Sequence, residues 1–243
     1  MKWRTHKAIT RTVCSKLGIQ AEEIANASVL PDKEPDYIYR AGRRRVYRVR
    51  APHHGREALD LAFNYLKRAR KAYLRGDRRY IEYLGRALHY VQDYSVDPKE
   101  KLWIFEYRSG HAHDERENGV ARLHVPEEAV STGFNEVCTP HRVKEIVYGA
   151  KPKKSPEEIM FLATYLSAIA VKSVFNPDKP PKLEENYSKA LKIHVVLVLL
   201  PLLILLAGVT ASTLALAAIL SFVMHKLDFN YHRWKLEHDW FRP

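Results

Sequence analysis

The stretch Arg79-Tyr-Ile-Glu-Tyr-Leu-Gly-Arg-Ala-Leu-His-Tyr-Val-Gln-Asp93 decides the fold, because its apolar residues recur with the period of an α-helix. Ile81, Leu84 and Leu88 fall on one face of that helix. His89 and Asp93 are four residues apart, so their side chains point to the same place. An imidazole nitrogen and a carboxylate oxygen are natural ligands for zinc or a similar ion. The pair alone does not specify a metal, because such a pair also occurs as a purely structural contact.

Other segments show the same helical period. Ile9, Val13 and Leu17 predict a first helix, and a second runs through the apolar positions at 59, 63 and 66 to Leu74, where Gly76-Asp77 ends it. Ser155-Pro156-Glu157-Glu158 is a typical helix start. No alternating strand of useful length stands out, so we predict an all-α multi-helix bundle.

Composition limits the class of protein. The 243 residues carry a net charge of +12, with 46% hydrophobic and 28% charged residues, which favours a packed core over disorder. The positive charge favours anionic partners such as phospholipid headgroups, nucleic acid or phosphorylated substrates. Cys14 and Cys138 lack CxxC spacing, so we expect reduced buried thiols, with a single disulfide as the alternative. The first residues do not resemble a signal peptide, and we expect a cytoplasmic domain.

An apolar segment near the C-terminus predicts a membrane anchor. No charged residue occurs from Val195 to Met224. The segment is long enough for one tilted span, the arrangement we favour, but the small residues Ala207-Gly208-Val209-Thr210 allow a short hairpin instead. The predicted organisation is therefore a helical domain at 1–175, a Pro- and Lys-rich linker at 176–192, a membrane segment at 193–225 and a polar, aromatic tail at 226–243. Basic residues flank the segment on both sides, which a hairpin would reconcile.

Histidine and acidic residues gather at predicted helix starts and helix faces. The candidate metal ligands are His6, Asp32, His53, His54, His89, Asp93, His111, His113, Glu115 and Glu117. Two HxxxE pairs overlap in one segment, His111 with Glu115 and His113 with Glu117, and the sequence does not choose between them. It does not choose between His53 and His54 either. His194 and His225 flank the apolar segment, and we expect them at the membrane interface. His124, His141, His232 and His238 lack matched partners.

The stretch Ala87-Leu-His-Tyr-Val-Gln-Asp-Tyr-Ser-Val-Asp-Pro98 resembles the signature helix of the zinc-dependent phospholipase C family, which is related to the single-strand-specific zinc nucleases. The order of the other candidates fits over residues 3–117: a Trp and a His near the N-terminus, an Asp in a loop, a His before a long helix, then HxxxD and HxxxE. The resemblance implies an all-α fold, three zinc ions and hydrolysis of phosphodiesters by zinc-activated water.

The resemblance also implies roles for single residues. Asp32, His53 or His54, His89 and Asp93 would hold one zinc, and Asp93 would bridge to a second ion held by His6. In the family that second ion is also bound by the amine and carbonyl of an N-terminal Trp, which Trp3 resembles. His111 or His113, with Glu115 or Glu117, would contribute to the remaining ion. Asp32 is the candidate general base.

Two positions depart from the family pattern. Trp3 is preceded by Met1 and Lys2, so its nitrogen lies in a peptide bond. The family has a further His shortly after the Pro of the signature helix, and here that place reads Pro98-Lys99-Glu100. Asp97 or Glu100 would have to substitute, or one site is lost.

The sequence thus predicts a membrane-anchored phosphodiester hydrolase with phospholipid as surface and substrate. The alternatives are a nuclease or nucleotidase on the same scaffold and a non-catalytic membrane-bound metal-binding domain. His113-Asp114 also allows a metal-dependent phosphohydrolase of the HD type. The basic segment 40–50 is either a lipid-docking surface or a solvated loop.

Overall fold

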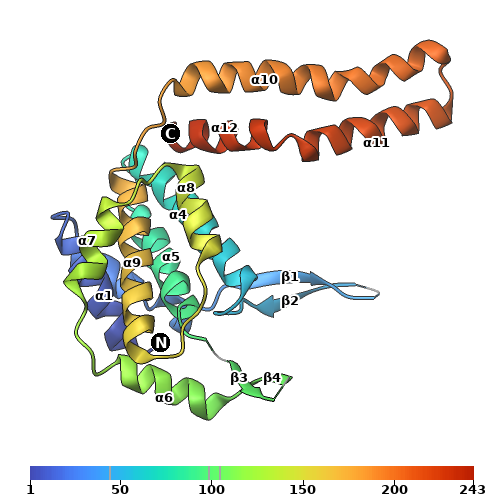
Figure 1. Cartoon of the computed structure of the whole chain (residues 1–243). Helices are drawn as coiled ribbons and strands as arrows, with labels where there is room; N and C mark the ends of the chain where they lie inside the picture. The colour runs from blue at the N-terminus through green and yellow to red at the C-terminus, as the bar shows by residue number, and fades with distance from the viewer. Residues whose placement is uncertain (44, 98, 104) are drawn as a thin grey trace. The chain divides into compact units, whose positions relative to one another are not determined.

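The computed structural model describes residues 1–243 except 44, 98 and 104, and it is mostly helical (Figure 1). The chain divides into two compact units, Met1–Asp178 with Pro243, and Lys179–Arg242. The break falls among the prolines of the predicted linker. The linker is shorter than predicted, however, because a helix begins at Leu183.

The first unit is a helical bundle carrying two small β-hairpins. Its helices are α1 (Trp3–Ser15), α2 (Ala21–Ala27), α3 (Leu30–Lys33), α4 (Arg56–Leu74), α5 (Tyr80–Tyr94), α6 (Gly110–Val120), α7 (Glu127–Asn135), α8 (Pro140–Gly149) and α9 (Pro156–Phe175). The helices predicted from periodicity are confirmed as α1, α4 and α5, although Leu17 lies beyond the end of α1, and the helix predicted from its start signal is confirmed as α9. Ser155 caps α9 by accepting a hydrogen bond from the backbone of Glu158, as its sequence indicates.

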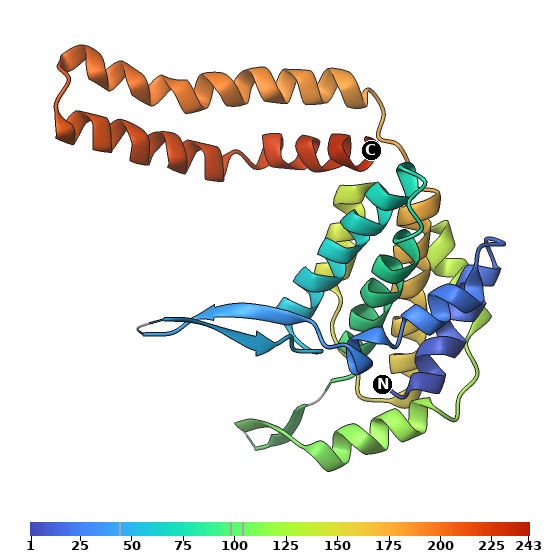
Figure 2. The ribbon, with the colours of Figure 1, turned by 180° about the vertical axis from the view of Figure 1, so that it is seen from behind.

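Helix α5 lies inside the bundle, packed against α2, α4 and α9, and both views show it there (Figures 1 and 2). Ile81, Leu84 and Leu88 are buried, as their spacing predicts. Gly85 allows the close approach of α2, because a Cβ there would lie 2.4 Å from the Cβ of Ala27 and 2.8 Å from the nitrogen of Ser28. This contact brings the end of α2 beside the functional half of α5.

The first β-hairpin was not predicted. Strands β1 (Tyr37–Ala41) and β2 (Val46–Arg50) pair antiparallel, with Tyr37 opposite Arg50 and Ala41 opposite Val46. Tyr and Val residues favour extended backbone, but both faces of this ribbon are largely exposed, so the polar–apolar alternation of a half-buried strand is absent. The basic segment 40–50 therefore belongs to a projecting hairpin. A second hairpin joins β3 (Lys99–Leu102) and β4 (Phe105–Arg108).

Helix α9 is apolar enough to cross a membrane, yet 67% of its most hydropathic window is buried inside the protein. Its apolar residues face neighbouring helices on nearly all sides, and it packs against α1, α4, α5, α6, α7 and α8. A helix that is apolar all round and surrounded by others is a core helix. It completes the bundle of the first unit.

The second unit is a helical hairpin. Helix α10 (Leu183–Leu199) continues into the 3₁₀ segment η1 (Leu200–Ala207), and the chain turns at Gly208 (φ +129°) before α11 (Ala211–Leu227) and α12 (Phe229–Trp240). The apolar segment is thus two arms that reverse at Gly208, as the hairpin alternative expects, and not one continuous helix; its arrangement in a membrane stays a prediction. The glycine and the Thr210 cap of α11 explain the reversal.

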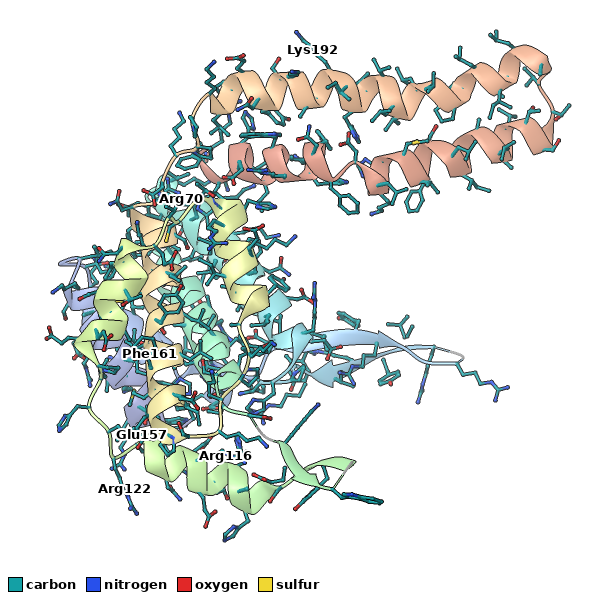
Figure 3. The ribbon with its side chains drawn as sticks, in the orientation of Figure 1. Arg70, Arg116, Arg122, Glu157, Phe161 and Lys192 are labelled. Atoms are coloured by element: carbon teal, nitrogen blue, oxygen red, sulfur yellow. The ribbon has the colours of Figure 1, made fainter. Side chains whose placement is uncertain are left out.

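The hairpin arms expose apolar side chains. Only 17% of the most hydropathic window of Leu183–Ala207 is buried, and Leu206 and Val209 at the tip are 84% and 72% exposed. The helices α11 and α12 meet at a bend of 58°. Leu183–Ala207 is long and apolar enough to span a membrane, and the bent pair qualifies if it is taken as one span. Lys192 projects outward from α10 (Figure 3).

Candidate metal centre

His89 and Asp93 form the middle of a buried polar cluster in the first unit. Both side chains leave the same face of α5, and His89 Nε2 lies 3.2 Å from Asp93 Oδ2. His89 is fully buried and Asp93 is 3% exposed. Polar groups at this depth require partners, because removing them from water is costly.

Hydrogen bonds fix the outer nitrogen of two imidazoles, which is the ring nitrogen opposite the one that faces Asp93. His89 Nδ1 lies 2.9 Å from the carbonyl oxygen of Ser28, which can only accept, so this nitrogen carries the proton. His6 Nδ1 lies 2.6 Å from Gln92 Oε1, while the amide nitrogen of Gln92 donates to Thr10 and Ser167. In both rings Nε2 is left as the nitrogen with the lone pair. This is how proteins orient metal-binding histidines.

Three side chains meet at the His89 nitrogen. Asp32 Oδ1 lies 3.8 Å from His89 Nε2 and 3.9 Å from His53 Nδ1, and the two imidazole nitrogens are 3.0 Å apart. The donor atoms of these residues all lie within 4.8 Å of one another. His53 Nδ1 is also 2.8 Å from Asp93 Oδ2. The group is therefore close enough to hold one metal ion.

The other oxygen of Asp93 serves a second group. Asp93 Oδ1 lies 3.1 Å from His6 Nε2 and 2.5 Å from the α-amino nitrogen of Met1. The donor atoms of His6, His89 and Asp93 also lie within 4.8 Å of one another. Each oxygen of Asp93 thus faces a different set of nitrogen atoms, as a carboxylate that bridges two ions would.

A third group comes from α6 and the loop before α4. His113 Nε2 lies 3.0 Å from Glu117 Oε1, and the same oxygen lies 2.5 Å from the Met1 amine. The rings of His113 and His54 stand edge to face with centroids 5.1 Å apart. Glu117 therefore joins this group to Met1 and, through it, to Asp93.

The structure distinguishes the two HxxxE pairs. His113 and Glu117 face the cluster, whereas the side chains of His111 and Glu115 are 84% and 69% exposed and contact each other at 3.7 Å. It also shows that the adjacent histidines His53 and His54 serve different groups. Of the ten candidate ligands, eight lie in or beside the cluster.

Among the described residues, the buried nitrogens His54 Nδ1 and His113 Nδ1 of this cluster have no hydrogen-bond partner, and His6 Nε2 has only the Asp93 carboxylate, at 3.1 Å. Unpaired buried nitrogens are costly, and a metal ion is the partner that a lone pair of this kind accepts. The residues thus fit divalent ions that prefer nitrogen and oxygen ligands.

Electrostatics favour the charged carboxylates. Burial alone would raise the pKa of Asp93, but the Met1 amine, His89 and His6 outweigh it and hold this pKa well below its usual range. Burial likewise opposes ionisation of Glu117, yet His113 and the Met1 amine lower its pKa to about 2. Burial lowers the pKa of His54 to about 4 and also lowers that of His6. Ionised carboxylates and neutral imidazoles are the forms that bind metals.

The cluster opens into a pocket of about 360 Å³. Arg50, at the end of β2, lines this pocket together with seven residues of the cluster and its surroundings: Met1, Asp32, His53, His54, Asp93, His113 and Glu117. A neighbouring pocket of about 550 Å³ shares His54 and is lined by Arg56, Lys99 and Lys151. One cationic side chain thus lines the acidic, imidazole-rich site, and three more line the neighbouring pocket.

The departures from the family pattern have structural counterparts. Trp3 is 49% exposed and its indole nitrogen donates to Asp32 Oδ2 at 2.8 Å, so Trp3 orients the aspartate. Asp97 caps the backbone of Lys99, and Glu100 forms an ion pair with Arg116, a residue of α6 labelled in Figure 3. Neither acid replaces the missing His in the cluster, and Pro98 lies outside the described residues.

Sequence reasoning missed Met1, Ser28, Gln92 and Arg50. Gln92 carried a signal, because it adjoins the predicted ligand Asp93 on a buried helix. The resemblance implied a terminal amine and carbonyl at Trp3, but the amine in the cluster is that of Met1, and no sequence pattern pointed to the carbonyl of Ser28. Comparisons of the chain with protein-family models, with curated proteins and with solved structures found no match. The function is therefore argued from the site.

Proposed function

We propose that this protein is a membrane-anchored, zinc-dependent phosphodiester hydrolase that acts on phospholipid in the manner of a phospholipase C. One observation carries the proposal: imidazoles and carboxylates from separate helices converge in one cluster, where hydrogen bonds fix the outer nitrogens of His6 and His89 and the Nδ1 atoms of His54 and His113 have no partner. Structural zinc sites need only four ligands, whereas this cluster offers three joined groups. Joined ion sites are the arrangement that hydrolyses phosphate esters.

Two ligand groups follow from the distances, and we propose a third from the contacts of His113. Asp32, His53, His89 and Asp93 Oδ2 would hold one ion. His6, Asp93 Oδ1 and the Met1 amine would hold a second, once that amine gives up its proton. His54, His113 and Glu117 would hold a third. When bound, zinc supplies a water whose pKa is lowered toward about 7 and positive charge for the phosphate oxygens.

The remaining residues orient and neutralise. Trp3 holds Asp32 Oδ2, so Oδ1 stays turned toward the imidazoles, where it can accept a proton from an attacking water. Arg50 lines the same pocket and is exposed. Its planar guanidinium matches two oxygens of a phosphate. These residues give the pocket a base and an anion-binding group on the protein side.

The hairpin of the second unit makes lipid a sensible substrate. An α-helix the length of α11, 17 residues, is about 25 Å long, shorter than the roughly 30 Å apolar core of a bilayer. The other arm, Leu183–Ala207, is long enough to span, but its uncharged part begins only at Val195. We infer that the hairpin dips into the membrane from one side and returns, which leaves both of its ends at the same surface. The exposed basic residues at those ends would then all meet anionic headgroups: Lys182, Lys189, Lys192, Lys226, Arg233 and Lys235.

A nuclease is the second candidate, favoured by the β1–β2 hairpin. Tyr37, Tyr39 and Tyr47 are 46%, 75% and 45% exposed on this ribbon, and the Arg48 guanidinium lies 3.7 Å from the centre of the Tyr37 ring. Exposed aromatic rings beside basic residues bind single-stranded nucleic acid by stacking. The same surface also fits the lipid-docking prediction for segment 40–50, so the substrate must be tested directly.

The test uses the full-length protein in detergent, loaded with zinc and freed of excess metal. Release of phosphorylated headgroup from phosphatidylcholine or phosphatidylethanolamine is measured beside degradation of single-stranded DNA. We expect headgroup release that a chelator abolishes and zinc restores. Faster DNA cleavage would favour the nuclease. Normal zinc content without cleavage of either substrate would refute an enzymatic function and leave a metal-binding membrane protein.

The two HxxxE pairs provide a matched control. His113→Ala removes a ligand of the proposed third group, and His111→Ala removes an exposed histidine two residues away on the same helix. We expect headgroup release to fall at least 100-fold in the first variant and to remain unchanged in the second, a loss of about 2.7 kcal/mol in transition-state stabilisation. Equal activity of the two variants would contradict the assignment.

A further inference from the structure

Three histidines that are distant in the sequence meet in the second unit. His194 lies on α10, His225 near the end of α11 and His232 on α12. The ring centroids are 5.1 Å apart for His194 and His225, 5.0 Å for His225 and His232, and 6.2 Å for His194 and His232. His225 and His232 lie on either side of the bend between α11 and α12.

The nitrogen atoms face one another at a ligand-like distance. His194 Nε2 lies 3.1 Å from His225 Nδ1. Two imidazole nitrogens bound to one tetrahedral zinc, at about 2.0–2.1 Å each, are roughly 3.3 Å apart, and their ring centres are about 5 Å apart. The spacing of His194 and His225 therefore matches two ligands of one zinc ion. The ligand atoms of all three histidines are not as close together as those of the first cluster, so the His232 ring must move inward to complete a site.

The outer nitrogens are already tied, as in the first cluster. His194 Nδ1 lies 2.9 Å from Asp228 Oδ2, and His232 Nε2 lies 2.7 Å from the carbonyl oxygen of His225. Both oxygens accept, so these two nitrogens carry the protons and the opposite nitrogens carry lone pairs. A carboxylate and a backbone carbonyl are the usual outer partners of metal-binding histidines. Tyr231 stacks on the His194 ring at 3.8 Å and further fixes its orientation.

We propose that His194, His225 and His232 form a second metal site, which binds zinc or a similar divalent transition metal with Asp228 orienting His194. Three imidazoles leave the fourth position of a tetrahedral ion open to water or another ligand. The ion ties both arms of the hairpin together where the chain bends. The site is separate from the cluster of the first unit and does not depend on the proposed hydrolase function.

The alternative is a histidine cluster that is held together by hydrogen bonds and binds no metal. Asp228 also accepts a hydrogen bond from the backbone nitrogen of Tyr231, so it caps α12 and satisfies the end of that helix. In that case the histidines only continue a chain of hydrogen bonds from the cap. The two arrangements differ in metal content, which is directly measurable.

The experiment counts zinc in the full-length protein, purified in detergent and equilibrated with the metal. The wild type is compared with His225→Gln, which loses one proposed ligand, and with His238→Gln. His238 lies in the same unit, stacked on Tyr187, and serves as the matched control. We expect His225→Gln to bind one zinc fewer than the wild type and His238→Gln to bind the same number. Equal zinc content in all three proteins would overturn the proposal in favour of the metal-free, hydrogen-bonded cluster.

A second readout separates ligand loss from misfolding. Cobalt replaces zinc and reports tetrahedral coordination through its visible absorption, so the wild type should show a component that His225→Gln lacks. Asp228→Asn keeps all three imidazoles and should retain that component while binding cobalt 10- to 100-fold more weakly. If His225→Gln does not fold, His232→Gln is measured in the same way, and an undiminished cobalt signal in it refutes the site.

Discussion

Replacing Gln92 with leucine tests whether the first cluster is built to bind metal. Gln92 is fully buried, and its side-chain oxygen accepts a hydrogen bond from His6 Nδ1 at 2.6 Å. The residue does not touch the pocket, so Gln92→Leu removes an orienting contact and no ligand. Leucine has a similar size, which limits the change in packing.

The expected losses of stability and metal affinity follow from the His6 hydrogen-bond donor that the substitution leaves without an acceptor. His6 is fully buried, and its Nδ1–H would lose its acceptor, which costs about 1–3 kcal/mol. Metal affinity should fall 10- to 100-fold. That loss corresponds to about 1.4–2.7 kcal/mol, the same range as the cost of the unpaired donor. Without metal, unfolding should shift down by about 2–4 °C for each kcal/mol lost.

The assay is competition with a chromophoric zinc chelator, with thermal unfolding measured in parallel on metal-free protein. Gln20, the other glutamine of the chain, is exposed and provides the control Gln20→Leu. We expect that control to bind zinc as tightly as the wild type. A folded Gln92→Leu protein with wild-type zinc affinity would show that His6 is not an oriented ligand, and the reasoning would be refuted.

Three further predictions concern packing, the membrane and pH. Gly85→Ala should lower the free energy of unfolding in denaturant by about 1–3 kcal/mol and weaken zinc binding, because the added Cβ would clash with atoms of α2. The control Gly149→Ala should leave both unchanged, because no atom lies within 4 Å of its added Cβ. Leu206→Arg should weaken binding to lipid vesicles about 100-fold in co-sedimentation, and Val137→Arg on the first unit should not. In metal-free protein, burial lowers the pKa of His54 to about 4 from 6.5, so its contribution to stability is present above pH 6.5 and lost as pH falls toward 4. The free energy of unfolding, measured with denaturant, should therefore fall more steeply between pH 6.5 and pH 4 in the wild type than in His54→Gln. Parallel curves for the two proteins would contradict this prediction.

Long periodic segments were predictable, and short or exposed ones were not. The periods of α4 and α5 fix their buried faces, Gly76 marks the end of α4, and Ser155 marks the start of α9. The β1–β2 hairpin escaped prediction because its residues are largely exposed on both faces, so burial leaves no alternation to read.

The ligands could be predicted as a set but not one by one. His111 and His113 are two residues apart and therefore about 200° apart around a helix, so only one of them can face inward. The side that α6 turns inward depends on its packing, which buries Val120, Arg116 and Glu117. Neighbouring residues such as His53 and His54 present the same difficulty in a loop.

The histidines of the second unit show a different limit. His194 and His225 were assigned to a membrane interface and His232 was left without a partner, because no spacing links them along one helix. They meet only when the chain reverses at Gly208 and bends at Asp228. Contacts made by a reversal of the chain depend on where the turn falls, which local patterns leave open.

The donor atoms of the first cluster are scattered from Met1 to Glu117, so an unfolded chain cannot assemble them. Whatever free energy the ions release on binding is therefore added to the folded state alone. Metal bound there would hold the first residues of the chain to helices α5 and α6. Scarcity of the metal would then lower the stability of the folded protein and shorten its life in the cell.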